Sequence, residues 1–414
     1  MPAFAILTPI LFPTLYLWLC DALALQRGTW VIESGTKFGI SAFGLEIEEA
    51  IFFLLTNVLV VFGTVAIDFT MAVHDLCATT WGLSQQRIGT FSVIQCIIAS
   101  PDKYPQERLG ALRDAADIVR RKSRSFWTAS FVFEGPLKLD LLSLYAWCRC
   151  TDDFIDEAPD AKSASALLNS CHQFLSATPS PPALSSPDKK HPTIAEILLS
   201  LPTASRTSFT LLATLPIPHH PLEELLSGYK SDISFFDTTL APTIRTDAHL
   251  LHYAENVASS VAELCVILVW AHGATPPPSP KEQEEIIRAA RTMGQALQIV
   301  NIVRDVEADA KVGRCYLPGI LACDIVEGRI SMRSLRGERL RLLSMAEELA
   351  NQSRPSISRL PDAASGPMRA ACDIYLAIGE RVRERMMLGL DEGRASLSKW
   401  TRIRAAWKAM KSYA

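Results

Sequence analysis

Two long runs without a charged residue constrain more than any other feature how this chain can fold. The first, AFAILTPILFPTLYLWLC, extends from Ala3 to Cys20, and the second, AIFFLLTNVLVVFGTVAI, extends from Ala50 to Ile67. At about 1.5 Å per residue, a helix of either length just crosses a hydrocarbon core of about 30 Å. The first run contains Pro9 and Pro13 and lacks the basic segment and clean cleavage site of a signal peptide. The sequence therefore predicts two membrane-spanning helices within residues 1–80.

Residues 81–414 show helical patterns and few alternating strand patterns, so we expect an all-α domain there. Two Pro- and Ser-rich segments, 176–192 and 275–280, are expected to be surface loops between its helices. A formal net charge of -3 gives no reason to expect nucleic acid as a partner. The 10 cysteines are scattered without a CxxC pair, which favours reduced thiols over a zinc site or a disulfide framework.

Three aspartates stand close together at the end of one expected helix, in the stretch RCTDDFIDEA. Asp152 and Asp153 precede Asp156 by four and three residues, so on a helix all three project to one side. Arg149 lies one turn before the first two. The alternative interpretation is a solvated, acidic helix end, because acidic pairs are common on surfaces.

A second polar line lies in ALQIVNIVRDVEADAKVGRCYLP, residues 296–318. Asn301, Asp305 and Asp309 follow one another at intervals of four residues, and Gln298 extends the line by another turn. Ordinary amphipathic helices put Lys and Glu on their polar side. This line instead supplies oxygen ligands with no cation to neutralise them.

Two such helices facing each other would make a cavity rimmed by five carboxylates, which needs positive charge to be stable. We expect Mg²⁺, with Mn²⁺ as the alternative, because Mg²⁺ prefers oxygen and is usually held by one or two carboxylates together with substrate phosphates. A metal-bound diphosphate is a good leaving group, since the metal neutralises the charge on the departing oxygen. These parts point to the ionisation of an allylic diphosphate in an apolar helical cavity.

The acidic stretches resemble the two signatures of the squalene/phytoene synthase family. KSRSFWTASFVFEGPLKLDLLSLYAWCRCTDDFIDEA is similar to the first, and MGQALQIVNIVRDVEADAKVGRCYLP is similar to the second, with its Gly-Arg-x-Tyr tail. YAENVASSVAEL resembles the segment between them, with Ser259 and Ala262 where the family usually has glycine. The resemblance implies an isoprenoid-synthase-type helical bundle in residues 81–414, preceded by a short transmembrane helical segment.

The resemblance also implies roles for individual residues. The implied metal ligands are Asp152, Asp153, Asp156, Asn301, Asp305 and Asp309. The same five aspartates are expected to be catalytic, together with Tyr253, whose ring face would guide a carbocation. The implied substrate-binding residues are Ser123, Ser125, Tyr145, Arg149, Gln298, Asn301, Arg304, Arg314 and Tyr316. For Tyr145 and Tyr253, packing in the core is an equally good interpretation.

The reaction that the resemblance implies is the head-to-head condensation of two geranylgeranyl diphosphates, through prephytoene diphosphate, to 15-cis-phytoene in carotenoid biosynthesis. Geranylgeranyl diphosphate, membrane lipid and other carotenoid enzymes are the expected partners. A squalene or dehydrosqualene synthase that uses farnesyl diphosphate is the alternative of the same class. A non-catalytic family relative that acts as a scaffold is the alternative of a different class.

The N-terminal segment carries a second resemblance. GTWVIESGTKFGISAFGLEIEEAIFFLLTN is similar to the last portion of a small membrane lycopene cyclase domain, which in fungi precedes phytoene synthase in one chain. Only about two spans and one acidic motif correspond to it, so we expect a partial, N-terminally truncated cyclase in residues 1–80. Glu48 and Glu49 are the candidate acids that would protonate a polyene end, and charges marking the start of the span are the alternative. The expected location is a membrane, with the synthase domain in the cytosol.

The C-terminal stretch SKWTRIRAAWKAMKSYA has apolar residues at helical spacing. Trp400, Ile403, Trp407 and Met410 recur there with Lys and Arg between them. Such a stripe could seat the domain on an anionic membrane surface. It more often packs onto its own domain, and packing is the outcome we expect.

Overall fold

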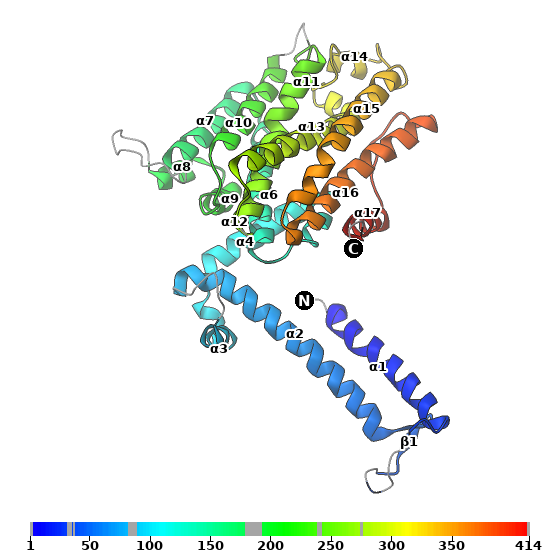
Figure 1. The fold of residues 1–414 in the computed structure, drawn as a ribbon. Helices are drawn as coiled ribbons and strands as arrows, with labels where there is room; N and C mark the ends of the chain where they lie inside the picture. The colour runs from blue at the N-terminus through cyan, green and yellow to red at the C-terminus, as the bar shows by residue number, and fades with distance from the viewer. Residues whose placement is uncertain are drawn as a thin grey trace. The chain divides into compact units, whose positions relative to one another are not determined.

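The structure is a computed structural model, and it describes residues 3–30, 35, 38–81, 89–178, 193–237, 242–273 and 276–411. By its contacts the chain divides into two compact units, Met1–Gln106 and Glu107–Ala414 (Figure 1). The domain boundary predicted after residue 80 rests on composition and resemblance, whereas the two units are defined by contacts. It remains a prediction, since residues beyond 80 also contact the N-terminal helices.

Two long apolar helices, α1 (Ala3–Gln26) and α2 (Ile47–Trp81), make up most of the N-terminal unit. The other elements of the unit are the two-stranded antiparallel ribbon β1 (Ser41–Ala42) and β2 (Leu45–Glu46), helix α3 (Thr90–Ile98) and the short 3₁₀ turn η2 (Pro101–Lys103).

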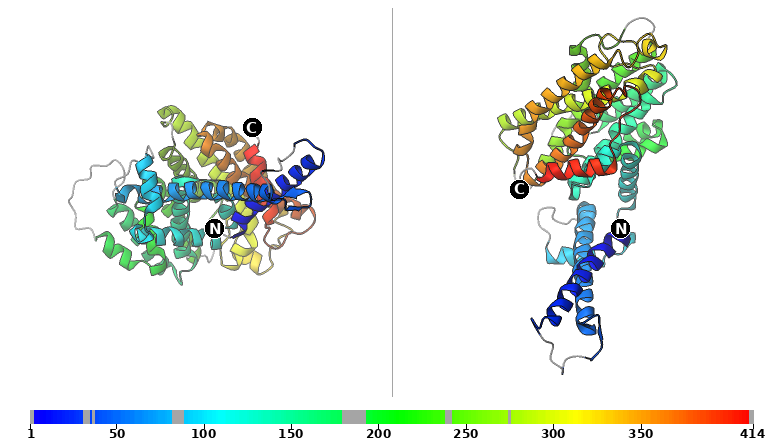
Figure 2. Two further views of the ribbon diagram at one scale, coloured as in Figure 1. Left: turned by 90° about the horizontal axis from the view of Figure 1, so that it is seen from below. Right: turned by 90° about the vertical axis from the view of Figure 1, so that its right-hand side faces the viewer.

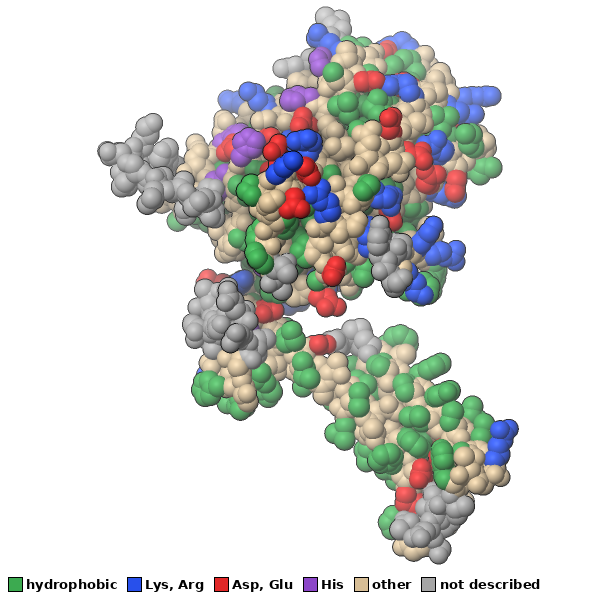
Figure 3. All heavy atoms as spheres, in the orientation of Figure 1, with side chains coloured by type: hydrophobic (Ala, Val, Ile, Leu, Met, Phe, Trp, Pro, Cys, Tyr) green, Lys and Arg blue, Asp and Glu red, His purple; other side chains and the backbone are tan. Residues whose placement is uncertain are grey.

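Helices α1 and α2 lie against each other and share polar contacts along their seam. The indole N–H of Trp18 donates to the Ala50 carbonyl oxygen at 2.9 Å, and the Asn57 amide donates to the Thr14 hydroxyl at 3.0 Å. Their remaining surface is apolar, as the side-chain colours in Figure 3 show, and Phe12 alone is 75% exposed. A surface of this kind is stable in lipid rather than in water.

Three helical stretches in the described part of the chain are long and apolar enough to cross a membrane, namely Ile6–Gln26, Ile47–Cys77 and Asp247–Ala271. The first two correspond to the predicted spans. The second continues past Asp68, where the uncharged run ends, because no helix-breaking residue follows. The third belongs to the C-terminal unit, where half of its apolar window is buried. It is therefore a core helix of that unit.

In its described residues the C-terminal unit contains helices and no strand, as the sequence predicts. Its helices are α4 (Gln106–Lys122), α5 (Arg124–Ser130), α6 (Gly135–Asp156), α7 (Ala161–Ala177), α8 (Ile194–Ser200), α9 (Thr203–Leu212), α10 (His220–Ile233), η3 (Ser234–Asp237), α11 (Asp247–Ala254), η4 (Glu255–Ser259), α12 (Ser260–Ala271), α13 (Pro280–Lys311), α14 (Ala322–Val326), α15 (Arg336–Ser353), η5 (Arg354–Arg359), α16 (Asp362–Met387) and α17 (Lys399–Lys411).

The bundle has two main hydrophobic cores, and Figure 2 shows its helices from two further sides. One core surrounds α13 where it contacts α15 and α16, and the other lies among α6, α7, α9, α10 and α12. In the second core the ring centroid of Phe209 lies 5.9 Å from that of Trp147 and 5.0 Å from that of Phe174. These three rings are fully buried and fix the packing of α6.

Both Pro- and Ser-rich segments adjoin helix ends. Helix α7 ends at Ala177, and residues 179–192 of the first predicted loop lie outside the described residues, as does Thr275 of the second. The second segment ends one residue earlier than predicted, because Pro280 begins α13 and Ser279 caps it in a capping box with Glu282.

Helix α13 lies in close contact with η4, the short turn that follows Tyr253. The five residues of η4 form a π-helical turn, a feature often found at functional sites. The hydroxyl of Ser259 donates to the Arg291 carbonyl oxygen at 2.5 Å, and a Cβ on Gly294 would lie 2.7 Å from Ser259 Cα. Glycine on α13 therefore permits the close approach, although Ser259 stands where the family usually has glycine.

Gly294→Ala should lower the free energy of unfolding of the C-terminal unit by about 2 kcal/mol or more, because the added methyl group must separate α13 from η4. Gly337→Ala on α15 is the matched control, since nothing lies within 4 Å of its added Cβ and alanine favours a helix. Thermal melting of both variants would measure the difference. Equal melting temperatures would contradict the tight contact.

Candidate active site

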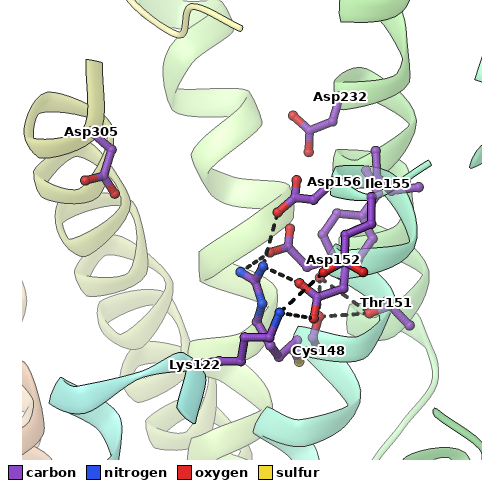
Figure 4. Close-up of polar contacts among 12 residues, drawn as sticks. Lys122, Cys148, Thr151, Asp152, Ile155, Asp156, Asp232 and Asp305 are labelled. Atoms are coloured by element: carbon purple, nitrogen blue, oxygen red, sulfur yellow. Dashed lines mark hydrogen bonds and ion pairs between the residues drawn. The ribbon is translucent and has the colours of Figure 1, made fainter. Parts of the chain in front are cut away.

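Helix α6 ends in the three aspartates of the first acidic stretch, and Arg149 lies among them. Its Nη1 donates to Asp152 at 2.6 Å, while its Nη2 contacts Asp153 and lies 3.2 Å from Asp156. The ammonium of Lys122, at the end of α4, lies 2.9 Å from Asp153 (Figure 4). One guanidinium can reach all three carboxylates because residues three, four and seven positions apart share a face of a helix.

Helix α13 carries the second acidic row. Asp305 accepts from Nε of Arg304 at 2.8 Å and from Nε and Nη2 of Arg394 at 2.7 and 3.1 Å. Arg394 belongs to the segment between α16 and α17, and no sequence pattern predicts its position beside Asp305. Asp309 lies one turn further along α13 and is half-buried.

The turn after α13 brings the two acidic rows together. Gly313 has φ +83°, a conformation that favours glycine, and it turns the chain back toward α6. The Arg314 guanidinium contacts the Asp156 carboxylate and donates to the Ile155 carbonyl oxygen at 3.3 Å. The backbone N–H of Arg314 also donates to the Asp309 carbonyl oxygen at 2.9 Å, so this one residue links the end of the second row to a carboxylate of the first.

The close-up in Figure 4 shows the same relation. Asp305 lies on one helix, and across from it lie Asp152, Asp156 and Asp232. The two rows do not point to opposite sides of the unit.

Burial gives the carboxyl groups of the two rows unequal acidity. Burial raises the pKa of Asp152 to about 7, and the neighbouring charge of Asp156 adds to the effect. Burial, with the charge of Asp305, likewise raises the pKa of Asp309 to about 7. Burial also acts on Asp305, but the hydrogen bonds and charges of Arg304 and Arg394 together outweigh it and hold the pKa of Asp305 below its usual value. Each row thus contains a carboxyl group whose ionised form needs more positive charge.

The site also contains Asp232, a buried acid on α10 that the sequence reasoning missed. Its side chain is accessible to only 3%, and it accepts hydrogen bonds from the hydroxyls of Tyr253 at 3.2 Å and Tyr316 at 2.8 Å. The two tyrosine rings stack with centroids 4.9 Å apart. Burial raises the pKa of Asp232 to about 7, although both hydroxyls lower it. The sequence signal that could have revealed Asp232 is its position as an isolated acid on a helix face rich in leucine.

Ser123 and Tyr145 lie beside the first acidic row. The Ser123 oxygen caps α5 by accepting the Phe126 N–H at 3.2 Å, and it lies 3.4 Å from the hydroxyl of Tyr375 on α16. The ring of Tyr145 stacks on Phe126 with centroids 4.3 Å apart. Tyr375, which the sequence reasoning also missed, links this corner to α16.

The remaining predicted residues lie on the same helices. Ser125 on α5 and Gln298 on α13 are half-buried. The side-chain oxygen of Asn301 is buried and has no hydrogen-bond partner among the described residues. A buried oxygen without a donor is costly, so this atom favours a bound cation or water.

The donor set suits a divalent ion that is shared with substrate phosphates. Among the described residues, no group of three or more His, Cys, Asp or Glu side chains could hold a metal ion by itself. A donor set that substrate phosphates and water complete fits Mg²⁺, which is usually bound through one or two carboxylates plus phosphates and water. The orphaned oxygen of Asn301 and the raised pKa values of Asp152 and Asp309 all favour added positive charge at the two rows.

Asp232→Asn should change how stability depends on pH. The pKa of Asp232 is raised when folded, so between about pH 4 and pH 7 the folded protein binds a proton that the unfolded chain lacks. This contribution to stability falls as pH rises and is lost above about pH 7. The asparagine variant has no such loss, so relative to wild type it should gain on the order of 2 kcal/mol between pH 5 and pH 8. Melting curves at both pH values measure it, and a difference independent of pH would contradict the buried acid.

Known proteins resemble this chain over nearly its whole length. The model of squalene/phytoene synthase matches residues 119–401. The bifunctional lycopene cyclase/phytoene synthase of Phaeosphaeria nodorum is 39% identical over 97% of this chain and 68% of its own length. The protein of that name from Neurospora crassa is 37% identical over 99% of this chain and 71% of its own length.

Solved structures of low identity share the fold. A dehydrosqualene synthase covers 74% of this chain with a TM-score of 0.55 and 20% identity, and 98% of that chain is matched. The squalene synthase of Alicyclobacillus acidocaldarius covers 68% of this chain with a TM-score of 0.50 and 21% identity, and 96% of that chain is matched. The predicted isoprenoid-synthase-type bundle is therefore confirmed. With two thirds of the chain matched by the family model, the chain belongs to the squalene/phytoene synthase family.

Proposed function

We propose that the C-terminal unit is a phytoene synthase that joins two geranylgeranyl diphosphates head to head, through prephytoene diphosphate, to 15-cis-phytoene. The family acts on prenyl diphosphates and generally uses a divalent metal. The observation that carries the proposal is the meeting of two acidic rows, on α6 and α13, through the Arg314–Asp156 contact. Relatives that match nearly the whole chain bear the name of a lycopene cyclase/phytoene synthase, which favours phytoene over squalene.

In this proposal each acidic row binds one substrate diphosphate. Asp152, Asp153 and Asp156 would hold metal for the first diphosphate. Asn301, Asp305 and Asp309 would hold metal for the second. Mg²⁺, when bound, supplies charge neutralisation for the departing diphosphates.

The arginines of the site have a second role in the proposal. Arg149, Arg304 and Arg314 pair with carboxylates of the two rows. A guanidinium fork fits phosphate oxygens equally well, so these side chains can exchange a carboxylate for a diphosphate when the acidic rows gain other cations. Ser123, Ser125 and Gln298 would donate further hydrogen bonds to the diphosphates.

The tyrosine pair would stabilise the cations that form after the first diphosphate leaves. Tyr253 and Tyr316 donate their hydroxyls to Asp232, which holds their stacked rings in one orientation. An aromatic face attracts a cation most strongly where water is excluded. Tyr145, stacked on Phe126, would do the same at the first row.

Purified protein given geranylgeranyl diphosphate and Mg²⁺ should form phytoene without NADPH. Asp153→Asn and Asp305→Asn should each lower turnover by roughly 100-fold or more, because the developing charge on the diphosphate loses a stabilising partner. Chelation of divalent ions should have the same effect, reversed by added Mg²⁺. Liquid chromatography with mass spectrometry identifies the product.

Asp247→Asn is the matched control. This aspartate pairs with Arg341 on the surface and is distant in sequence from both acidic rows. The variant should therefore leave turnover unchanged. NADPH-dependent squalene from farnesyl diphosphate as the main product would establish the same-class alternative instead. Full activity in both row variants would contradict the roles proposed for the two acidic rows, and a wild-type chain that forms no product would favour the non-catalytic relative.

For the N-terminal unit we propose a contribution to lycopene cyclisation. Glu48 and Glu49 lie in the first turn of α2, where Glu48 accepts the backbone N–H of Phe38. Asp21, buried on α1, interacts with Glu49, so two helices bring acids to the same end of the pair. Acids gathered at the end of an apolar helix pair are placed to donate a proton to a polyene end.

Glu49→Gln should abolish cyclised product from lycopene supplied to the reconstituted chain, while phytoene formation persists. Chromatography of the carotenoids after incubation measures both. Unchanged cyclisation in this variant, or none in the wild-type chain, would leave the acids as charges that mark the start of the span.

A further inference from the structure

The last helix, α17, is held firmly to the bundle by one face. Its inner face carries Ala406 and Ala409, which pack with Ala129 of α5 and with Ala370 and Ile374 of α16. The guanidinium of Arg369, a buried arginine on α16, donates to the Ala409 carbonyl oxygen at 3.2 Å. Small side chains allow the helix to lie close against its neighbours, so its orientation is fixed.

The opposite face of α17 exposes large apolar side chains. Trp400 is 75% exposed, Trp407 is 62% exposed and Ile403 is 39% exposed. Met410 is 40% exposed, and its sulfur lies near Gly366 of α16. The expectation that this stripe packs onto the domain is therefore wrong for the two tryptophans, because the alanines occupy the packing face instead.

The same face is strongly basic. Between Lys399 and Lys411 the helix contains five basic residues and no acidic one, in a chain whose net charge is -3. Four of the five are exposed, and none of the five forms an ion pair in the described part of the protein: Lys399, Arg402, Arg404, Lys408 and Lys411. The ammonium of Lys411 lies 3.9 Å from the centroid of the Trp407 ring.

A neighbouring segment adds to this surface. Phe131 follows α5 two residues after Ala129, which packs on α17, and it is 63% exposed. The ammonium of Lys138 lies 5.4 Å from its ring centroid. Phe131, like Trp407, is thus accompanied by a cation.

We propose that α17 is an interfacial helix that docks on the surface of an anionic phospholipid bilayer. Tryptophan is the side chain best suited to the boundary between head groups and acyl chains. Lysine and arginine flanking it would bind lipid phosphates, and each adds attraction to an anionic surface. A protein partner would be expected to meet mixed charges, whereas this face offers cations alone.

The docking is supported by the rest of the chain. Helices α1 and α2 are long and apolar enough to cross a membrane, so the same polypeptide keeps α17 near a bilayer. Such a tether raises the effective concentration of lipid around a weak binding face. A single amphipathic helix can therefore determine the orientation of the C-terminal unit on the membrane.

Hydroxyl-radical footprinting of the full chain in lipid nanodiscs tests the proposal, because exposed Trp and Met side chains are oxidised readily. With about 30% phosphatidylserine in phosphatidylcholine, oxidation of Trp400 and Trp407 should fall roughly threefold or more relative to pure phosphatidylcholine. The protection should weaken at about 0.5 M salt. Met387, at the end of α16 and 68% exposed, is the internal reference and should not change.

A charge variant gives the second measurement. The docking variant combines Lys399→Gln, Arg404→Gln, Lys408→Gln and Lys411→Gln. Its matched control removes the same charge from exposed positions elsewhere, with Lys162→Gln, Lys281→Gln, Arg288→Gln and Arg333→Gln. The docking variant should lose the protection that phosphatidylserine confers, and the control should keep it. Equal melting temperatures would show that both are folded.

Three results would overturn the proposal. Equal oxidation of both tryptophans in the two lipid mixtures would mean that the anionic surface does not bind α17. Loss of protection in the control variant as well would mean that net charge, not this helix, is responsible. Protection that rises with protein concentration in lipid-free amphipol would identify a second copy of the chain as the occupant.

Discussion

The structure of the site depends on balancing negative charge in a poorly hydrated place. Five aspartates on α6 and α13 come together there, and carboxylates removed from water repel one another strongly. Guanidinium groups offset that cost: Arg149 serves the first row, Arg304 and Arg394 serve the second, and Arg314 joins them. The balance remains incomplete, since burial still raises the pKa of a carboxyl group in each row. A site with this shortage of positive charge is prepared for cations that arrive with an anionic substrate.

Holding the two acidic rows close together requires tight helix packing elsewhere in the bundle. Gly294 lets α13 approach η4 so closely that a methyl group has no room. Arg291, three residues earlier, binds the glutamates of three neighbouring segments at 2.7–3.2 Å: Glu224, Glu255 and Glu263. Arg291 and Gly294 precede the predicted ligand positions on the same side of α13, so packing and chemistry occupy successive segments of one helix.

Spacing along the sequence predicted much of this arrangement. Residues such as Asp152 and Asp156 repeat at the helical period, and the same periodicity reveals their row without knowledge of the fold. Asp232 has no partner at that spacing, and Arg394 is 89 residues from the carboxylate it binds, so only tertiary structure reveals them. The exposed tryptophans of α17 were misassigned for a related reason. A sequence shows that a helix has two faces, but not which one its neighbours cover.

Helix α16 connects two parts of the molecule that have been described separately. Ile374 packs beneath α17, and Tyr375, the next residue, lies against Ser123 at the first acidic row. A helix is stiff over so short a distance, so a shift of one side chain is transmitted to the other. In the proposed docking, α16 therefore connects the lipid-bound helix with the residues beside the first acidic row. Changes in bilayer composition would then reach the chemistry mechanically, without any effector that binds in the chamber itself.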